Sequence, residues 1–443
     1  MSRPLRIAVA GLGTVGAGVV RLLQQHRALI ARRAGRELQV VAVSARDARR
    51  ERGIDLAGVR WQSDPLKLAL DPEVEVVCEL IGGEDGIALA LARAALAAGK
   101  PLVTANKAML AVHGAELAAL AEERGTTIGF EAAVAGGIPV IKALREGLAA
   151  NGIRRVYGIL NGTCNYILTQ MRESGRPFSE VLEEAQRLGY AEADPATDID
   201  GYDAAHKLAL LAALAFGGRP RFDAIHIEGI RQVTPEDIRY AEELGYRIKL
   251  LGVARMTAAG LEQRLHPAMV PAQAPIAQVE GVFNGVVVDG DFVGSTVYEG
   301  RGAGAGPTAS AVVADLIDLA RGRRLPVFGV PCSALADHPV APMAAHVGCY
   351  YIRLQVVDRP GVMAEIAAVL RDHAISIESL IQRGRNPGRG VPIVLTSHET
   401  TEEAMVRALA QIGRLPSVLE EPRMIRIEPL EAGPGQPEGG RRP

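Results

Sequence analysis

Short apolar runs alternate with stretches of helical periodicity along the first third of the chain. Such runs indicate buried parallel strands, and the stretches between them indicate crossover helices. The predicted strands are Arg6–Ala10, Leu38–Ser44, Val74–Leu80, Pro101–Thr104 and Thr127–Glu131, and the predicted helices are Val15–Arg33, Ile87–Ala98 and Gly114–Arg124. This alternation predicts an α/β fold with a doubly wound parallel sheet.

The pattern changes after about residue 140. A helix at Phe178–Leu188, with Gly189 placed to cap its C-terminus, lies among extended segments. The extended segments are Ile153–Leu160, Leu265–Pro267 and Val286–Asp289. They predict an α+β middle domain with a sheet of its own. A glycine-dense stretch at 300–306 leads into an apolar helix, Ala309–Leu319, which could pack back on the first domain.

The last hundred residues follow a proline-rich segment, Pro326–Pro342, which is typical of a linker. Four strands and two helices are predicted after it. The strands are Tyr350–Val356, Ser376–Gln382, Val391–Ser397 and Met424–Ile427, and the helices are Val362–Asp372 and Glu402–Ile412. The order βαββαβ predicts a small ferredoxin-like domain.

Composition indicates the broad class of protein but not its function. The 443 residues exceed a single core, and 48% hydrophobic residues with a net charge of −2 suit a soluble protein without a nucleic-acid-binding surface. The longest apolar stretch, Leu208–Phe216, is far below the roughly 20 residues of a membrane helix. Four separated cysteines and the lack of a signal pattern favour the reducing cytoplasm over a disulfide framework.

A glycine fingerprint closes the first predicted strand and opens the first helix: Gly11, Leu12, Gly13, Thr14, Val15 and Gly16. In this context Gly11 permits a tight turn, Gly13 lets the backbone approach a pyrophosphate, and Gly16 allows close helix–strand packing. The helix N-terminus offers amide donors to phosphates. The fingerprint therefore predicts a nicotinamide dinucleotide site, with a simple glycine turn as the alternative.

The end of the second strand bears on which nicotinamide cofactor binds. NAD-specific sites place a carboxylate there for the ribose 2′-hydroxyl, whereas Arg46 occupies this position and Asp47 follows it. An arginine can pair with a 2′-phosphate, so NADP is favoured over NAD. The alternative is that Arg46 points into water.

Several longer segments together resemble homoserine dehydrogenases of the form that carries a C-terminal ACT domain. The matching segments are 11–16, 104–107 (TANK), 131–139 (EAAVAGGIP), 161–166 (NGTCNY), 188–195 (LGYAEADP) and 203–207 (DAAHK). The resemblance implies reversible NAD(P)H-dependent reduction of L-aspartate 4-semialdehyde to L-homoserine, a step of threonine and methionine biosynthesis, by direct hydride transfer.

Hydride delivery to an aldehyde leaves negative charge on its oxygen, so a proton donor or a fixed cation must lie beside it. Asp203 and Lys207 are four residues apart in a helical stretch and share one face. With the resemblance, Lys207 is the favoured general acid/base and Asp203 a catalytic residue and substrate ligand. Lys107, after the strand Pro101–Thr104, is expected to act in catalysis and in binding substrate and cofactor. An ordinary surface ion pair and a solvated lysine are the alternatives.

The resemblance implies further site residues. Gly162 and Thr163 would bind substrate, and Glu192 would bind both the substrate ammonium and the cofactor. Gly189 and Gly304 would touch the cofactor, Gly304 at its nicotinamide end. A monovalent cation, sodium, is implied for a segment comprising Glu131, Val134, Gly136 and Ile138, largely through backbone carbonyls.

Cys164 opens a competing reading. A cysteine could form a thiohemiacetal, as in a phosphorylating semialdehyde dehydrogenase. Its neighbours Asn161, Thr163 and Asn165 would orient groups rather than deprotonate a thiol, and His206 is the nearest candidate base. A nucleotide- and amino-acid-sensing regulator without catalysis is the third possibility.

Asp358–Val362 joins a strand to a helix and Ile375–Ile377 begins the next strand, as in ACT domains. The resemblance implies feedback control by threonine, with a purely structural dimerisation domain as the alternative, and a homodimer or homotetramer. Deletion after about residue 345 is expected to leave the chemistry intact. The expected parts are a Rossmann-type nucleotide-binding domain at 1–139, an α+β catalytic and dimerisation domain at 140–325, a linker at 326–346, the ACT domain at 347–430 and a flexible tail at 431–443.

Overall fold

A six-stranded parallel sheet forms the first domain of the computed structural model, which describes residues 3–383 and 390–430. The strand order is β3-β2-β1-β4-β5-β6. The strands are β1 (Leu5–Ala10), β2 (Leu38–Ser44), β3 (Arg60–Trp61), β4 (Val76–Glu79), β5 (Leu102–Thr104) and β6 (Ile128–Gly129). This order reverses at β1, as in a Rossmann-type sheet, and confirms the α/β prediction.

Helices cover this sheet. Two of them differ from the predicted ones in their bounds, and the short helix at 66–70 was not predicted. They are α1 (Thr14–Gln25), α2 (Arg27–Ala34), α3 (Leu66–Leu70), α4 (Ile87–Ala97) and α5 (Lys107–Glu123). The helix predicted at 15–33 is broken at His26, whose φ of −107° and ψ of 22° leave the helical region. Helix α5 begins at Lys107 rather than Gly114, because the side chain of Asn106 caps it by accepting a hydrogen bond from the Met109 amide.

The middle domain pairs long antiparallel strands with a layer of helices. Its strands are β7 (Ile153–Ile159), β8 (His226–Ile227), β9 (Tyr246–Thr257), β10 (Gly260–Pro271), β11 (Phe283–Gly290) and β12 (Gly294–Arg301). Its helices are α6 (Val140–Lys142), α7 (Gly162–Ser174), α8 (Phe178–Arg187), α9 (Ala196–Ile199), α10 (Tyr202–Phe216) and α11 (Pro235–Glu243). The buried helix α10 packs its apolar side chains against β9 and β10.

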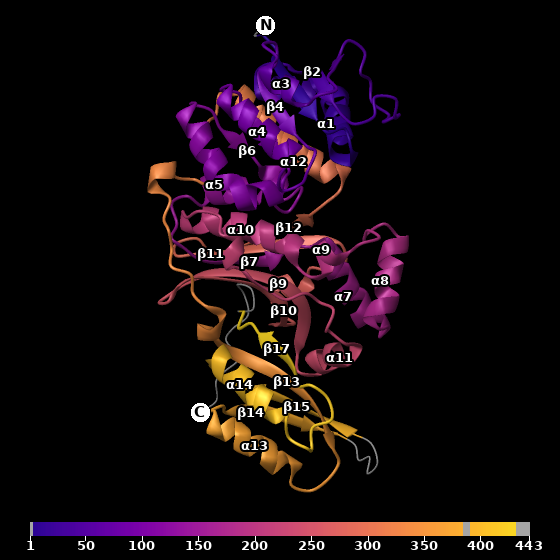
Figure 1. The fold of residues 1–443 in the computed structure, drawn as a ribbon, viewed down its shortest axis with the longest axis vertical. Helices are drawn as coiled ribbons and strands as arrows, with labels where there is room; N and C mark the ends of the chain where they lie inside the picture. The colour runs from indigo at the N-terminus through magenta and orange to yellow at the C-terminus, as the bar shows by residue number, and fades with distance from the viewer. Residues whose placement is uncertain (1–2, 384–389, 431–443) are drawn as a thin grey trace.

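Helix α12 (Ala305–Ala320) leaves the middle domain and packs against α1 of the first domain. Figure 1 shows it lying among the N-terminal elements. Contact is close at Gly18, where an added Cβ would lie 2.9 Å from the Ala305 carbonyl oxygen. The chain thus passes from the first domain to the middle domain and back, which brings the N-terminus of α12 against α1, the helix that follows the glycine fingerprint.

The C-terminal domain has the predicted order and lies at the opposite end of the molecule from the N-terminal domain (Figure 1). It comprises β13 (Val347–Val357), α13 (Val362–Asp372), β14 (Ile377–Gln382), β15 (Gly390–Ser397), β16 (Thr400–Thr401), α14 (Glu402–Ile412) and β17 (Arg423–Ile427). The sheet order β17-β13-β15-β14 is ferredoxin-like. The expected flexible tail, 431–443, falls outside the described residues.

The expectation that the middle domain has a sheet of its own is wrong. Strand β17 pairs with β10 in parallel, through Ala268 with Arg426 and Met269 with Ile427, and merges both sheets into one of eleven strands. A pairing this short leaves no hydrophobic pattern that sequence reasoning could detect. The segment 326–346 is also anchored to the domains, for example by Phe328 against Phe130. Across the described ranges, no helix is both long and apolar enough to span a membrane.

A chain ending at residue 345 should therefore lose its fold rather than retain an active core. Arg264 on β10 is almost fully buried and pairs with Glu428, and removing one partner of a buried ion pair costs about 3–5 kcal/mol. Thermal unfolding and gel filtration of the truncated and full chains measure the effect. A truncated chain that melts at the temperature of the full chain and stays monodisperse would restore the view of a separable module.

Candidate active site

The glycine fingerprint forms an open cradle between β1 and α1. Gly11 has a φ of +94°, and an added Cβ there would lie 2.3 Å from the Leu80 carbonyl oxygen. An added Cβ at Gly16 would lie 1.8 Å from the Gly11 carbonyl oxygen. At Gly13, by contrast, an added Cβ would have no other atom of the described residues within 4 Å. The turn and the helix packing thus require two of the glycines, and the open third lets a pyrophosphate approach the backbone. The residues present fit a dinucleotide.

The loop after β2 presents positive charge. Arg46, Arg49 and Arg50 are exposed. The Asp47 carboxylate accepts a hydrogen bond from the Arg49 amide at 2.8 Å, so it is turned into its own loop. Arg52 holds this loop to the cradle, since its Nε donates to the Leu12 carbonyl oxygen at 3.0 Å.

Two lysines meet one carboxylate where the first and middle domains face each other. Asp203 lies in the first turn of α10, and its Oδ2 is 2.7 Å from Lys207 Nζ, one turn later. Its Oδ1 is 2.9 Å from Nζ of Lys107, the first residue of α5. The predicted i,i+4 pair is thus joined by a residue from the other domain. Lys207 also donates to the Leu160 carbonyl oxygen at 2.7 Å.

The N-terminus of α7 completes this cluster. Asn161 caps the helix and donates from Nδ2 to Asp203 and to Asp198, each at 2.9 Å. The Thr163 hydroxyl lies 2.9 Å from Asp198 Oδ2 and 2.8 Å from the Tyr190 carbonyl oxygen. We call Lys107, Asn161, Asp198, Asp203 and Lys207 the catalytic cluster, after the role that the family resemblance implies for Lys107, Asp203 and Lys207.

Charge pairing fixes the protonation states within the cluster. Burial opposes ionisation of Asp203, but the two ammonium groups prevail and hold the pKa of its carboxyl well below the usual range. Asp203 in turn raises the pKa of Lys107 against its burial. Asp198 differs, because burial and the charge of Asp203 raise its pKa. The cluster therefore holds a fixed anion between two cations at neutral pH.

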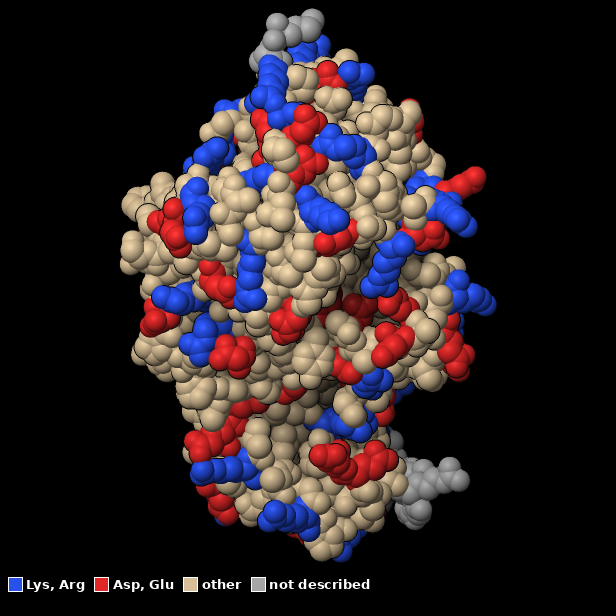
Figure 2. All heavy atoms as spheres, turned by 45° about the horizontal axis from the view of Figure 1, so that its top comes forward, with Lys and Arg blue, Asp and Glu red and all other residues tan. Residues whose placement is uncertain are grey.

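The other predicted ligands lie at helix ends and on one turn. Gly304, with a φ of +114°, precedes α12, and Gly162 begins α7. Gly189 and Glu192 lie on the exposed turn after α8, whose Tyr190 carbonyl meets Thr163. Among the described residues no contact joins the Glu192 carboxylate to the catalytic cluster. Figure 2 shows acidic and basic side chains interspersed on one face, with acidic groups lining a hollow part-way down it.

Known proteins match this chain from end to end. The homoserine dehydrogenase family model matches residues 139–317, its NAD-binding domain model 11–131, and the ACT domain model 350–415. The homoserine dehydrogenase of Pseudomonas aeruginosa is 48% identical over 97% of this chain and all of its own length. The chain belongs to the homoserine dehydrogenase family. It is accordingly an oxidoreductase with an ACT domain.

Solved structures agree with this assignment. A homoserine dehydrogenase from Thiobacillus denitrificans superimposes with a TM-score of 0.91 at 48% identity, covering 96% of this chain and 98% of its own. That of S. aureus gives 0.76 at 29% identity, covering 97% and 100%. A hyperthermophilic archaeal homoserine dehydrogenase solved with NADPH gives 0.61 at 26% identity, covering 73% and 99%.

The segment for which the family resemblance implies a cation is unusual in its backbone. Ala135 and Gly136 have consecutive positive φ values of 55° and 54°, and a non-glycine residue in this region is strained. The Glu131 carboxylate accepts hydrogen bonds from the amides of Ile141 and Lys142 at 2.9 Å each. Within the described ranges no cluster of three or more His, Cys, Asp or Glu side chains could hold a metal ion, so backbone carbonyls would have to supply most ligands.

Cys164 is placed unfavourably for covalent catalysis. It is buried in α7, and its thiol donates to the Asp198 carbonyl oxygen at 3.2 Å. Burial and the charges of Asp198 and Asp203 raise the pKa of the thiol well above its usual value. A thiolate nucleophile is therefore disfavoured here.

Sequence reasoning missed several polar residues of this homoserine dehydrogenase. Glu79, buried at the end of β4, accepts hydrogen bonds from the amides of Ile81 and Gly82 and from the Thr104 hydroxyl, and so shapes the loops that face the cradle. The buried carboxamide of Asn284 lies so close to Gly302 that a Cβ there would be 2.1 Å from its Cγ. Glu79 could have been found from the sequence, because it is a charged residue at the end of an apolar run. The sequence around Asn284 carries no such signal.

The buried Glu131 predicts a pH-dependent stability in buffer free of sodium and potassium. Burial and Asp315 raise its pKa from 4.5 to about 7, so between these values the folded chain binds more protons than the unfolded chain. The free energy of unfolding should then fall as pH rises across this window, by about 3 kcal/mol from this group. Denaturant titrations of wild type and Glu131→Gln measure it, with the exposed Glu123→Gln as control. An unchanged slope in Glu131→Gln would exclude Glu131 as its source.

Proposed function

We propose that the chain interconverts L-aspartate 4-semialdehyde and L-homoserine with NADP(H), in threonine and methionine biosynthesis. The observation that carries this proposal is the pairing of Lys107 and Lys207 with Asp203, where α5 of the cofactor domain meets α10 of the middle domain. Membership of the homoserine dehydrogenase family supports the substrate.

Lys207 is the proposed general acid and base. Its ammonium has three N–H donors, of which one points to the Leu160 carbonyl oxygen and one to Asp203. The third is free to donate to the carbonyl oxygen of the substrate as negative charge develops there, and to recover the proton in the oxidation direction. The nicotinamide, when bound, supplies or accepts the hydride.

Asp203 and Lys107 hold the polar part of the substrate in this proposal. Both oxygens of Asp203 are already engaged by ammonium or amide donors. A substrate ammonium would therefore compete with Lys107, whose side chain is 36% exposed and hence the easier partner to displace. Lys107 would then be free to face the substrate carboxylate or the cofactor. Gly162 and Thr163, at the start of α7, and Glu192 are the further proposed substrate ligands, and Gly189 and Gly304 remain proposed cofactor contacts.

NADP is the proposed cofactor in preference to NAD. One oxygen of the Asp47 carboxylate accepts a hydrogen bond from its own loop, and the exposed Arg46 can pair with a 2′-phosphate. The archaeal relative solved with NADPH supports this choice. A phosphorylating enzyme acting through Cys164 is disfavoured by the buried thiol, and a non-catalytic sensor by the charge-paired cluster.

Three further features belong to the proposal. Threonine would bind the ACT domain and inhibit the enzyme. Sodium would bind at Glu131, Val134, Gly136 and Ile138, where the backbone is strained. A homodimer or homotetramer would cover the edge strand β12, where Val297 is exposed. The four free cysteines suit the cytoplasm.

Lys207→Ala should lower kcat for homoserine oxidation by about a hundredfold to ten-thousandfold, the usual contribution of a positioned acid or base. NADPH affinity, followed by fluorescence titration, should stay within about twofold, because binding of the dinucleotide depends on the cradle. Lys100→Ala serves as a control, since Lys100 Nζ bonds only the remote Asp71 carbonyl among the described residues. Wild-type turnover in Lys207→Ala would remove this lysine from the mechanism.

Homoserine oxidation measured side by side with NADP and NAD, with and without threonine, tests the function directly. We expect turnover that favours NADP and falls with threonine. Arg46→Ala should raise KM for NADP by about tenfold and leave KM for NAD unchanged, because one charge-assisted contact is worth about 1.5 kcal/mol. Equal use of both cofactors by the wild type would contradict the role of Arg46, and an absence of turnover would contradict the proposed function.

A further inference from the structure

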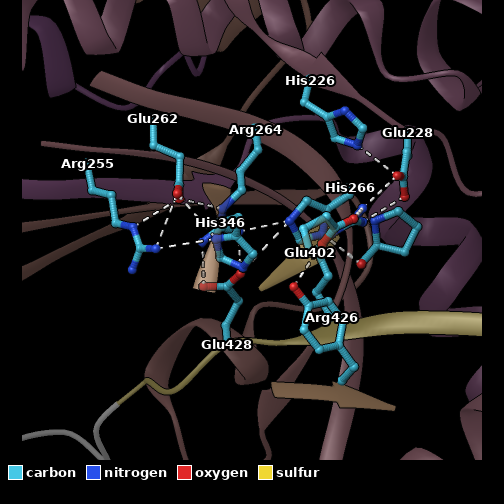
Figure 3. A network of polar contacts seen from close by, with 12 residues as sticks. His226, Glu228, Arg255, Glu262, Arg264, His266, His346, Glu402, Arg426 and Glu428 are labelled. Carbon is cyan, nitrogen blue, oxygen red and sulfur yellow. Dashed lines mark hydrogen bonds and ion pairs between the residues drawn. The ribbon is translucent and has the colours of Figure 1, made fainter. Parts of the chain in front are cut away.

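A network of charged side chains, buried except at His226, Glu228 and Arg255, joins the middle domain to the ACT domain (Figure 3). Its members come from β8 and the residue after it (His226, Glu228), β9 (Arg255), β10 (Glu262, Arg264, His266), the residue before β13 (His346), the start of α14 (Glu402), and β17 and the residue after it (Arg426, Glu428). The network lies across the junction where β17 pairs with β10. Burying a charged group costs free energy unless opposite charge and hydrogen bonds replace its hydration, so each buried group here needs such partners.

One half of the network ties β10 to β17. Arg264 donates from Nε to Glu262 at 2.8 Å and from Nη2 to Glu428 at 3.1 Å. Its Nη1 also donates to His266 Nε2 at 2.8 Å, so His266 is neutral, and burial and the neighbouring arginines lower its pKa well below the usual value. This half anchors the two domains to each other.

The other half points toward the catalytic cluster. Arg426 of the ACT domain places two guanidinium nitrogens 2.8 Å from the two oxygens of Glu228 in the middle domain. Its Nε donates to Glu402 of its own domain at 3.0 Å. His226 lies 2.7 Å from the same Glu228 carboxylate. Such a bidentate pair fixes the orientation of the carboxylate and of the backbone that carries it.

The backbone after Glu228 is clamped onto the end of α9. The Ile230 amide donates to the Ile199 carbonyl oxygen at 2.9 Å. An added Cβ at Gly229 would lie 2.2 Å from that oxygen and 2.6 Å from Asp200 Cα, so only glycine permits this approach. Arg231 then pairs with the Asp200 carboxylate, with Nη2 at 3.0 Å.

The clamped turn holds two parts of the catalytic cluster. Asp198 lies in α9 and accepts from Asn161 and Thr163. Gly201, with a φ of +94°, caps α10, and an added Cβ there would lie 2.7 Å from a methyl of Leu265 on β10. Helix α10 then carries Asp203 and Lys207. From Glu228 to these carboxylates the contact is continuous through hydrogen bonds and close backbone packing.

We propose that Glu228 and Arg426 are positioning residues through which the ACT domain holds the turn at 198–201 in the geometry that catalysis requires. The inference rests on the proposed function, since it assigns the residues of the cluster to homoserine turnover. It makes the ACT domain part of the support of the active site, and any ligand that shifts β17 would change turnover through this pair.

Glu228→Gln tests the proposal, because it keeps the shape of the side chain and removes its charge. We expect kcat for homoserine oxidation to fall by about tenfold to a hundredfold, the scale of a small misplacement of reacting groups, while KM for NADP stays unchanged. The acidic limb of the pH profile should move to higher pH, because a loosened turn weakens the pairing that keeps Asp203 ionised. Amide hydrogen exchange should rise in peptides covering 196–203.

Glu243→Gln is the matched control. Glu243 on α11 pairs with Arg383 of the ACT domain and so also links the two domains, but it does not contact the turn at 198–201. It should keep wild-type kcat, pH profile and exchange. Gly229→Ala, which pushes directly against Ile199, should reproduce the effect of Glu228→Gln.

The outcomes separate the two hypotheses. Wild-type kcat and exchange in Glu228→Gln would overturn the positioning role, as would equal losses in Glu228→Gln and Glu243→Gln. A wild-type chain without homoserine turnover would instead contradict the proposed function, and the exchange measurement would then still decide whether Glu228 holds the turn.

Discussion

A carboxylate buried away from water stays ionised only where positive charge and hydrogen bonds replace its hydration, and Asp203 is such a group. Lys207 from its own helix, Lys107 from the cofactor domain and Asn161 from α7 supply that replacement. Each donor comes from a different element. The relative placement of α5, α7 and α10 therefore depends on the two oxygens of one ionised carboxylate. The distance between the cofactor domain and Lys207 depends on the same carboxylate.

The need to keep Asp203 beside its positive partners also links the middle domain to the ACT domain. Helix α10 must hold Asp203 in one position, and its first turn packs on Leu265 of β10 and on β8. Strand β10 also forms the seam with β17 of the ACT domain. A displacement at the seam is therefore transmitted to the catalytic cluster by packing and hydrogen bonds. In this architecture the distance from the ACT domain to the active site is bridged by rigid elements rather than by a linker.

The sequence predicted features that depend on neighbouring residues well, and contacts between distant segments poorly. Periodicity placed the strands of the first domain except the two-residue β3, and it gave the βαββαβ order of the ACT domain. The spacing of Asp203 and Lys207 predicted their contact. Both kinds of prediction depend on residues close in the chain. The approach of Lys107 to Asp203 depends on how α5 packs on α10, which no local pattern encodes. The merger of two sheets at β10 and β17 escaped prediction for the same reason, as did the roles of Asp198 and Glu79. The family resemblance pointed to Lys207, Lys107 and Asp203 as site residues, without the contact that joins Lys107 to Asp203.

Strand β10 carries polar residues at positions that the fold buries, which the local sequence pattern would not predict. Glu262, Arg264 and His266 alternate along one face of a strand that is buried throughout, where apolar side chains would cost less. Burying them is tolerable because β17 and its neighbours supply opposite charge, and the pairing fails if the strands slip by one residue. A hydrophobic seam would hold the ACT domain as firmly but would accept several registers. The charged seam accepts a single register. That register fixes the positions of Glu228, of the turn at 198–201 and of the Asp203 carboxylate.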